Sequence, residues 1–216
     1  MKKNLTEMVF ILDCSGSMSG LESDTIGGFN SMLHKQKLED GEALVSVVLF
    51  DHESRVLYDR TPIERVPDMT DRDYQVRGST ALLDALGGAV HHIATVHRYA
   101  REEDRPEKTV FVIVTDGMEN SSRCYRSHEV KKMVSHEQEK YGWEFLFLGA
   151  NMDAIEAAGS YGIRADRAVR YECDSMGTEL NFRCVSNALG RIRTKQPMGA
   201  DWKKDIEEDY RKRGTK

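Results

Sequence analysis

Two short apolar runs that end abruptly at polar residues constrain the fold more than any other feature of this sequence. The first, residues 8–12, stops at Asp13, and the second, residues 110–114, stops at Thr115 and Asp116. An apolar run without alternation is typical of a strand that is buried on both faces of a parallel sheet. Open sheets of this kind bind ligands at the carboxyl ends of their strands. We therefore expect the two polar clusters to lie along one edge of a sheet.

Strand-like and helical segments alternate along most of the chain. The predicted strands are residues 8–12, 43–50, 55–58, 109–114, 143–149 and 167–171. The predicted helices, which carry apolar residues at helical spacing, are residues 21–38, 82–96, 127–140, 153–161 and 176–192. This order predicts an α/β fold, a doubly wound Rossmann-like sandwich around a six-stranded, mostly parallel sheet. Residues 55–58 would pair with the preceding strand as a hairpin, which gives one antiparallel edge strand.

The chain length of 216 residues suits one large domain with a short appendage. We expect a domain over residues 1–194 and a charged, helical C-terminal tail over residues 195–216, where Trp202, Ile206 and Tyr210 form a weak apolar stripe. A formal net charge of −5 without a long basic run argues against nucleic acid as a partner. The sequence contains no signal-peptide pattern and no apolar stretch of roughly 18–20 residues, so we expect a cytoplasmic protein without a membrane partner.

Three loops carry oxygen atoms that could bind a metal ion. Asp13, Ser15 and Ser17 follow the first strand, Thr80 comes just before the helix at residues 82–96, and Asp116 follows the second apolar run. Carboxylates and hydroxyls form a hard, all-oxygen ligand set, which favours magnesium over softer metals. Each loop taken alone is equally typical of a turn or a helix cap. Together, at one sheet edge, they predict a site for a single divalent cation.

The pattern Asp13-x-Ser15-x-Ser17, followed by Thr80 and then Asp116, resembles the metal-ion-dependent adhesion site (MIDAS) of von Willebrand factor type A (VWA) domains. The resemblance covers about residues 5–193, fills all five ligand positions and is closest to cytosolic, bacterial-type members. It implies a bound magnesium ion, or another divalent cation such as manganese or calcium. It also implies that an Asp or Glu of a partner protein completes the coordination, and it suggests an ATPase, chaperone or stress-response system as the setting.

Three functions are compatible with these observations. The leading hypothesis is a non-enzymatic, metal-dependent protein-binding module, an adaptor or scaffold. The alternative is a magnesium-dependent phosphatase or phosphotransferase on a similar sheet. Against the enzyme, the residue two positions after the first-strand Asp13 is Ser15, which cannot act as the general acid of haloacid dehalogenase-like enzymes, and a P-loop is absent. A third possibility is a structural subunit that assembles through the tail.

Three further polar residues neighbour the predicted ligands in the sequence. Glu119 and Asn120 follow Asp116 closely, and Asp51 ends the strand at residues 43–50. Glu119 and Asn120 could contact water around the ion, although exposed loop positions are expected. Asp51 is expected either at the rim of the site or in a turn.

Overall fold

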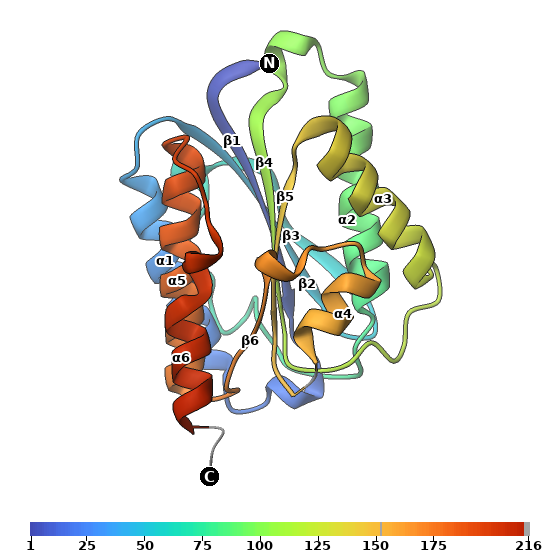
Figure 1. Ribbon diagram of the computed structural model, residues 1–216, viewed down its shortest axis with the longest axis vertical. Coiled ribbons are helices and arrows are strands. Elements are labelled where there is room, and N and C mark those ends of the chain that lie inside the picture. Colours follow the sequence, from blue (N-terminus) through green and yellow to red (C-terminus); the bar gives the residue numbers. More distant parts are fainter. Residues whose placement is uncertain (152, 214–216) are drawn as a thin grey trace.

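Six strands form one central sheet that lies between two layers of helices (Figure 1). In the computed structural model, which describes residues 1–151 and 153–213, the strands are β1 (Lys2–Asp13), β2 (Glu42–Phe50), β3 (Ser54–Pro62), β4 (Pro106–Thr115), β5 (Glu144–Gly149) and β6 (Ala168–Arg170). Their order across the sheet is β3-β2-β1-β4-β5-β6. β3 runs antiparallel to β2, and all other neighbouring strands are parallel. The predicted doubly wound α/β fold with one antiparallel edge strand is confirmed.

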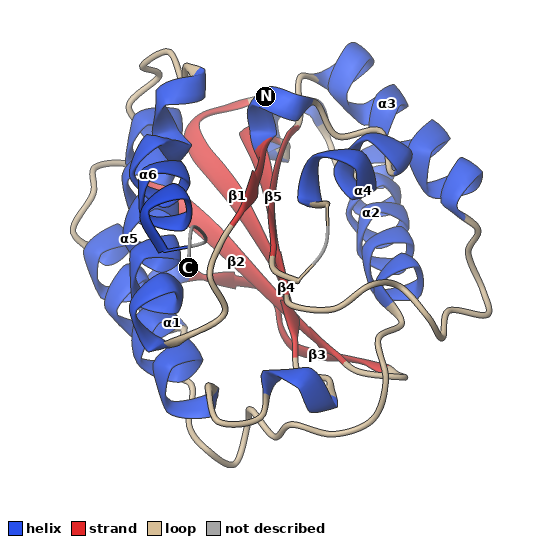
Figure 2. Cartoon of the chain, turned by 60° about the horizontal axis from the view of Figure 1, so that its bottom comes forward, coloured by secondary structure: helices blue, strands red, loops and turns tan. Residues whose placement is uncertain are grey.

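The helices divide evenly between the two faces of the sheet, as Figure 2 shows. One layer contains α1 (Glu22–Lys37), α5 (Ser175–Arg193) and α6 (Lys204–Arg213), and the other contains α2 (Leu82–Tyr99), α3 (Ser127–Tyr141) and α4 (Ala154–Ser160). None of the helices in the described part of the chain is both long and apolar enough to cross a membrane.

β1 is apolar on both of its faces, and it lies at the centre of the sheet. Phe10 and Leu12 belong to the apolar core under α1 and α5, whereas Val9 and Ile11 belong to the core under α2 and α3. All four side chains are at most 1% exposed. Burying one such side chain stabilises the fold by about 1.5–3 kcal/mol. The strand that leads to Asp13 is therefore held firmly from both sides.

The predicted site lies where the strand order reverses. From β1 the chain proceeds to β2 on one side, and from β4 it proceeds to β5 on the other. Leu12 is paired with Val114, so Asp13 and Thr115 follow side by side at the carboxyl ends of these strands. Such a switch point is the usual ligand-binding position in an open α/β sheet.

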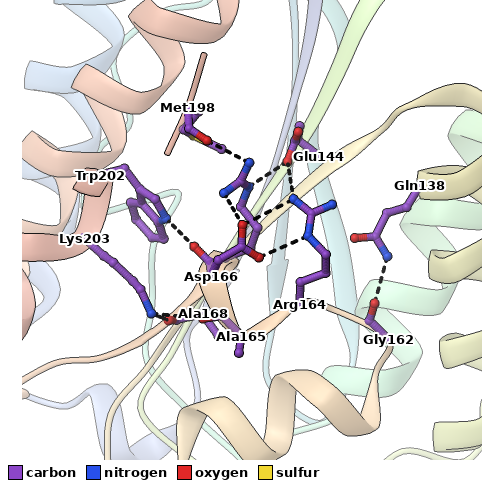
Figure 3. A network of polar contacts seen from close by, with 11 residues as sticks. Gln138, Glu144, Gly162, Arg164, Ala165, Asp166, Ala168, Met198, Trp202 and Lys203 are labelled. Atoms are coloured by element: carbon purple, nitrogen blue, oxygen red, sulfur yellow. Dashed lines mark hydrogen bonds and ion pairs between the residues drawn. The ribbon is translucent and has the colours of Figure 1, made fainter. Parts of the chain in front are cut away.

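The C-terminal segment, which includes α6, belongs to the helix layer that contains α1 and α5. Trp202 and Ile206 are buried in the same core, with 6% and 1% exposure. The Trp202 indole N–H donates to the Asp166 carbonyl at 2.9 Å, and the Lys203 ammonium donates to the Ala168 carbonyl at 2.7 Å (Figure 3). The domain boundary after residue 194 stays a prediction, and residues 214–216 of the predicted tail lie outside the described residues.

Candidate metal centre

The Asp13 carboxylate has a fixed orientation at the end of β1. One oxygen, Oδ1, accepts a hydrogen bond from the backbone N–H of Ser15 at 2.7 Å. The other, Oδ2, accepts one from the Thr115 hydroxyl at 2.5 Å. The hydroxyl of Tyr74 donates to the Asp13 backbone carbonyl. Because Asp13 is only 1% exposed and is bonded on both sides, its carboxylate has little freedom to turn away from the switch point.

Ser15 precedes a 3₁₀ turn over Gly16–Met18 as its N-cap residue, and Ser17 lies within this turn. The hydroxyls of Ser15 and Ser17 are 3.1 Å apart, and that of Ser17 donates to Asp116 Oδ1 at 2.6 Å. The N–H of Gly16 donates to the Gly78 carbonyl at 3.0 Å, which ties this turn to the loop that carries Thr80. The first loop is thus joined to both of the others.

Thr80 enters the site from the start of α2. Its hydroxyl lies beside Gly117, because a Cβ built on that glycine would be 3.1 Å from Thr80 Oγ1 and 3.4 Å from Ser17 Oγ. The backbone around Thr80 is held by Asn120, whose side-chain oxygen accepts from the Thr80 N–H and whose N–H donates to the Thr80 carbonyl, each at 3.0 Å. Thr80 and Ser17 therefore face the same small space next to Gly117.

Asp116, which directly follows β4, is the fifth of the predicted site residues. It is 1% exposed, and its Oδ2 lies 3.7 Å from the thiol of Cys173, which donates to it. Burial and the Asp116 charge raise the pKa of Cys173 to about 12, so the sulfur keeps its proton. The structure thus brings all five predicted residues together, whereas their role as metal ligands stays a prediction.

Two buried carboxylates share this site without a positive charge beside them. Burial raises the pKa of Asp13, and the neighbouring Asp116 charge raises it further. Burial also raises the pKa of Asp116. Within the described residues their hydrogen-bond donors are hydroxyls, a backbone amide and a thiol, and neither carboxylate forms an ion pair. A buried carboxylate is costly unless it is paired or bound to a metal. The donor set therefore fits a small divalent cation, which would supply the missing positive charge.

Several residues around the site were missed or misjudged by the sequence analysis. Thr115 bonds directly to Asp13, and its position opposite β1 follows from strand register, which composition alone does not give. Tyr74 lies in an irregular segment that carries no recognisable signal. Glu119, expected in an exposed loop, is half-buried and accepts the Leu83 N–H at 2.8 Å. Glu119 thus fixes the start of α2.

Asp51 forms an ion pair and hydrogen bonds that hold the loops around the site. Its carboxylate pairs with the Arg77 guanidinium at 2.7 Å and accepts the Glu53 N–H at 2.8 Å, while its carbonyl accepts the Ala81 N–H at 2.7 Å. These bonds form a turn and also hold the segment that carries Thr80. The turn expected for Asp51 is therefore present, and its side chain is fully engaged there.

Comparisons with known proteins identify the fold. No protein-family model and no curated protein matches the sequence. Among solved structures, a von Willebrand factor type A protein from Catenulispora acidiphila matches with a TM-score of 0.55 and 17% identity, over 85% of this chain and 42% of that one.

Two further solved structures agree with this match. Proximal thread matrix protein 1 from the mussel byssus, in a structure with a zinc-occupied MIDAS motif, has a TM-score of 0.57 and 15% identity, over 86% of this chain and 46% of that one. The ArnB paralog VWA2 from Sulfolobus acidocaldarius has a TM-score of 0.51 and 16% identity, over 86% and 44%. The chain spans less than half of each of these three proteins. At this level of identity the likeness concerns the fold, and the chain has the fold of von Willebrand factor type A domains.

Proposed function

We propose that this protein is a metal-dependent protein-binding module, an adaptor or scaffold without catalytic activity. In this proposal Asp13, Ser15, Ser17, Thr80 and Asp116 hold one divalent cation. The observation that carries the proposal is the meeting of three loops at the switch point, where two buried carboxylates and the hydroxyls of Ser15 and Ser17 form one hydrogen-bonded group with Thr80 beside it.

The chemistry of the donors favours magnesium, with manganese and calcium as alternatives. Every donor is oxygen, and two of the five residues are acidic. Magnesium binds proteins through one or two carboxylates and keeps water on its remaining positions. The zinc-occupied MIDAS of the mussel protein supports divalent metal binding on this fold in general.

A partner's Asp or Glu is the proposed ligand for the open position. A divalent cation that keeps water on an open position attracts a partner's carboxylate strongly once that water is excluded. We place the protein in the cytoplasm, beside an ATPase, chaperone or stress-response system. The hydrogen bonds around Asp13 hold its carboxylate in a fixed orientation before any partner binds.

Titration calorimetry with magnesium, manganese and calcium tests the metal site. The wild-type chain, freed of metal with a chelator, should bind magnesium, and Asp13→Ala should not. Asp13→Asn keeps the shape and most hydrogen bonds of the side chain, so it separates loss of charge from loss of fold. Asp71→Ala is the matched control, because Asp71 is exposed and lies outside the site. Equal magnesium binding by Asp13→Ala and wild type would overturn the assignment.

A pull-down then tests the partner. Proteins retained by the immobilised chain in magnesium, released by chelator and absent from the Asp13→Asn resin would be the partners, and each should lose binding when one of its acidic residues is replaced. Turnover of a generic phosphate ester that depends on both magnesium and Asp13 would favour the phosphatase alternative.

A further inference from the structure

A cavity of about 500 Å³ lies at the opposite end of the sheet from Asp13. It opens between the C-terminal parts of α2 and α3, and Pro106 and Trp143 line it near the amino ends of β4 and β5. In Figure 1 this is the upper end of the molecule, whereas β1 ends at the lower end. Its volume lies within the range of about 300–1,000 Å³ that is typical of small-molecule sites.

Two polar groups on the cavity wall have no hydrogen-bond partner among the residues that the structure describes. Glu137 is 7% exposed, and its carboxylate accepts no hydrogen bond and forms no ion pair within the described residues. Trp143 is 5% exposed, and its indole N–H likewise donates to no acceptor there. The N–H of Trp202, by contrast, is bonded to the Asp166 carbonyl. Neither group is among the fully enclosed polar atoms without a partner, so both are open to the space of the cavity and are available to a ligand.

The mouth of the cavity is cationic, although the chain as a whole has a net charge of −5. Arg98 on α2 and Lys132 on α3 form no ion pair within the described residues, and the Lys140 ammonium lies over the Tyr141 ring at 5.1 Å. Glu102 is the one exposed acid in the lining that the structure describes. Two cations in the lining, one on each helix and both without an ion pair among the described residues, favour a ligand that carries more than one negative charge.

Other ligand classes fit this cavity less well. Three histidines line it, yet the described residues contain no group of three His, Cys, Asp or Glu that could hold a metal. One of the three, His97, already contacts the buried Glu7 through Nε2 at 2.5 Å. A purely apolar ligand would cover Glu137 and Trp143 and leave both without hydrogen-bond partners, which is unfavourable.

We propose that this cavity binds a phosphate ester of a nitrogen heterocycle, of the size of a nucleoside monophosphate. Arg98 and Lys132 contact the phosphate, since guanidinium and ammonium groups are the usual phosphate ligands in proteins. The Glu137 carboxylate accepts from N–H groups of the heterocycle, and the Trp143 indole donates to a ring acceptor. This site is independent of the metal centre.

Titration calorimetry of the full chain in EDTA tests the proposal, because chelation keeps the metal centre from holding phosphate. The probes are the four nucleoside 5′-monophosphates, the matching nucleosides and inorganic phosphate. At least one monophosphate should bind, with its nucleoside and phosphate each about tenfold weaker or more. Arg98→Ala and Lys132→Ala should each weaken that monophosphate about tenfold. Lys131→Ala, next to Lys132 but outside the cavity lining, should leave it unchanged.

A second pair of variants tests the heterocycle contact. Glu137→Gln should weaken the monophosphate and its nucleoside by the same factor and leave phosphate unaffected, whereas Glu139→Gln should change none of them. Circular dichroism confirms that each variant is folded. The proposal is overturned if no monophosphate binds at millimolar concentration, if phosphate alone binds as tightly as the ester, or if Lys132→Ala binds like wild type.

Discussion

The two ends of the sheet present charge in opposite ways. At the carboxyl end, Asp13 and Asp116 are each 1% exposed and receive hydrogen bonds from neutral donors. At the amino end, Arg98 and Lys132 are exposed and unpaired within the described residues, near the buried carboxylate of Glu137. The first end has buried carboxylates without an ion pair, and the second has exposed cations without an ion pair among the described residues.

The two ends of the sheet are expected to depend on their ligands to different degrees. A buried carboxylate without a counter-charge is costly, whereas an exposed cation in water costs little. The carboxyl end should therefore couple ligand binding to stability more strongly than the amino end.

The largest effect should come from magnesium itself. At a hundredfold excess over its dissociation constant, magnesium should stabilise the wild-type chain by about 2.7 kcal/mol, which raises the midpoint of thermal denaturation by about 5–10 °C. Asp13→Asn should abolish this shift and leave nucleotide binding at the other end intact. Thermal denaturation followed by circular dichroism, with magnesium and with EDTA, measures this shift in the midpoint. A full shift in Asp13→Asn would show that magnesium does not stabilise the chain through the Asp13 carboxylate.

A methyl group at Gly117 should disturb the candidate metal centre, although Gly117 is not one of the five proposed ligands. The added Cβ would lie 3.1 Å from Thr80 Oγ1 and 3.4 Å from Ser17 Oγ, so one hydroxyl has to move. We expect Gly117→Ala to weaken magnesium binding about tenfold, or ~1.4 kcal/mol, by calorimetry. The matched control is Gly27→Ala on α1, where a Cβ meets nothing within 4 Å. Unchanged binding in Gly117→Ala would mean that Thr80 and Ser17 are not ligands.

Removing the Thr115 hydroxyl should have a smaller effect on the same site. Thr115→Val deletes the donor to Asp13 Oδ2 and keeps the shape of the side chain. With that oxygen less firmly oriented, magnesium affinity should fall about fivefold, or ~1 kcal/mol. Thr6→Val on β1 is a control, since Thr6 is also buried but belongs to the other end of the strand. A gain in affinity in Thr115→Val would show that the hydroxyl competes with the ion.

Much of the fold could be predicted because it depends on local pattern, and the errors have physical causes. β1 begins at Lys2, six residues before the predicted start, and contains the polar Glu7 in a fully buried position. That burial is possible because Arg60 on β3 and His97 on α2 contact the two carboxylate oxygens, each at 2.5 Å. β3 extends to Pro62 because Thr61 and Pro62 continue its pairing with Val45 and Leu44 on β2. Partners 53 and 90 residues away in the chain leave no local signal.

The two sites also differ in how far the sequence alone reveals them. The five residues of the metal centre follow strand ends or precede a helix, so their convergence follows from the fold class. The cavity at the amino end is formed by side chains of two helices, and its shape depends on how α2 and α3 pack. His91 on α2 and His136 on α3 both line this cavity. Helical periodicity indicates which side of a helix is buried, but not that two buried sides leave a space between them.

The smallest effect concerns the pH dependence of stability at the amino end. Burial raises the pKa of Glu137, while the charges of His136, His97, Lys140 and Arg98 act in the opposite direction without reversing the shift. A carboxyl whose pKa is higher in the folded than in the unfolded chain favours folding while it is protonated. This contribution is lost as the pH rises through the folded pKa.

The Glu137→Gln variant should therefore become more stable relative to wild type as the pH rises from about 4 to about 7, because glutamine does not ionise. Urea denaturation at several pH values, without nucleotide, measures this difference, and Glu139→Gln on the exposed side of α3 should show none of it. If the difference instead shrinks with rising pH, the ionised Glu137 is held by the nearby cations. Arg98 would then already have its counter-charge, and the contrast between the two ends of the sheet would fail.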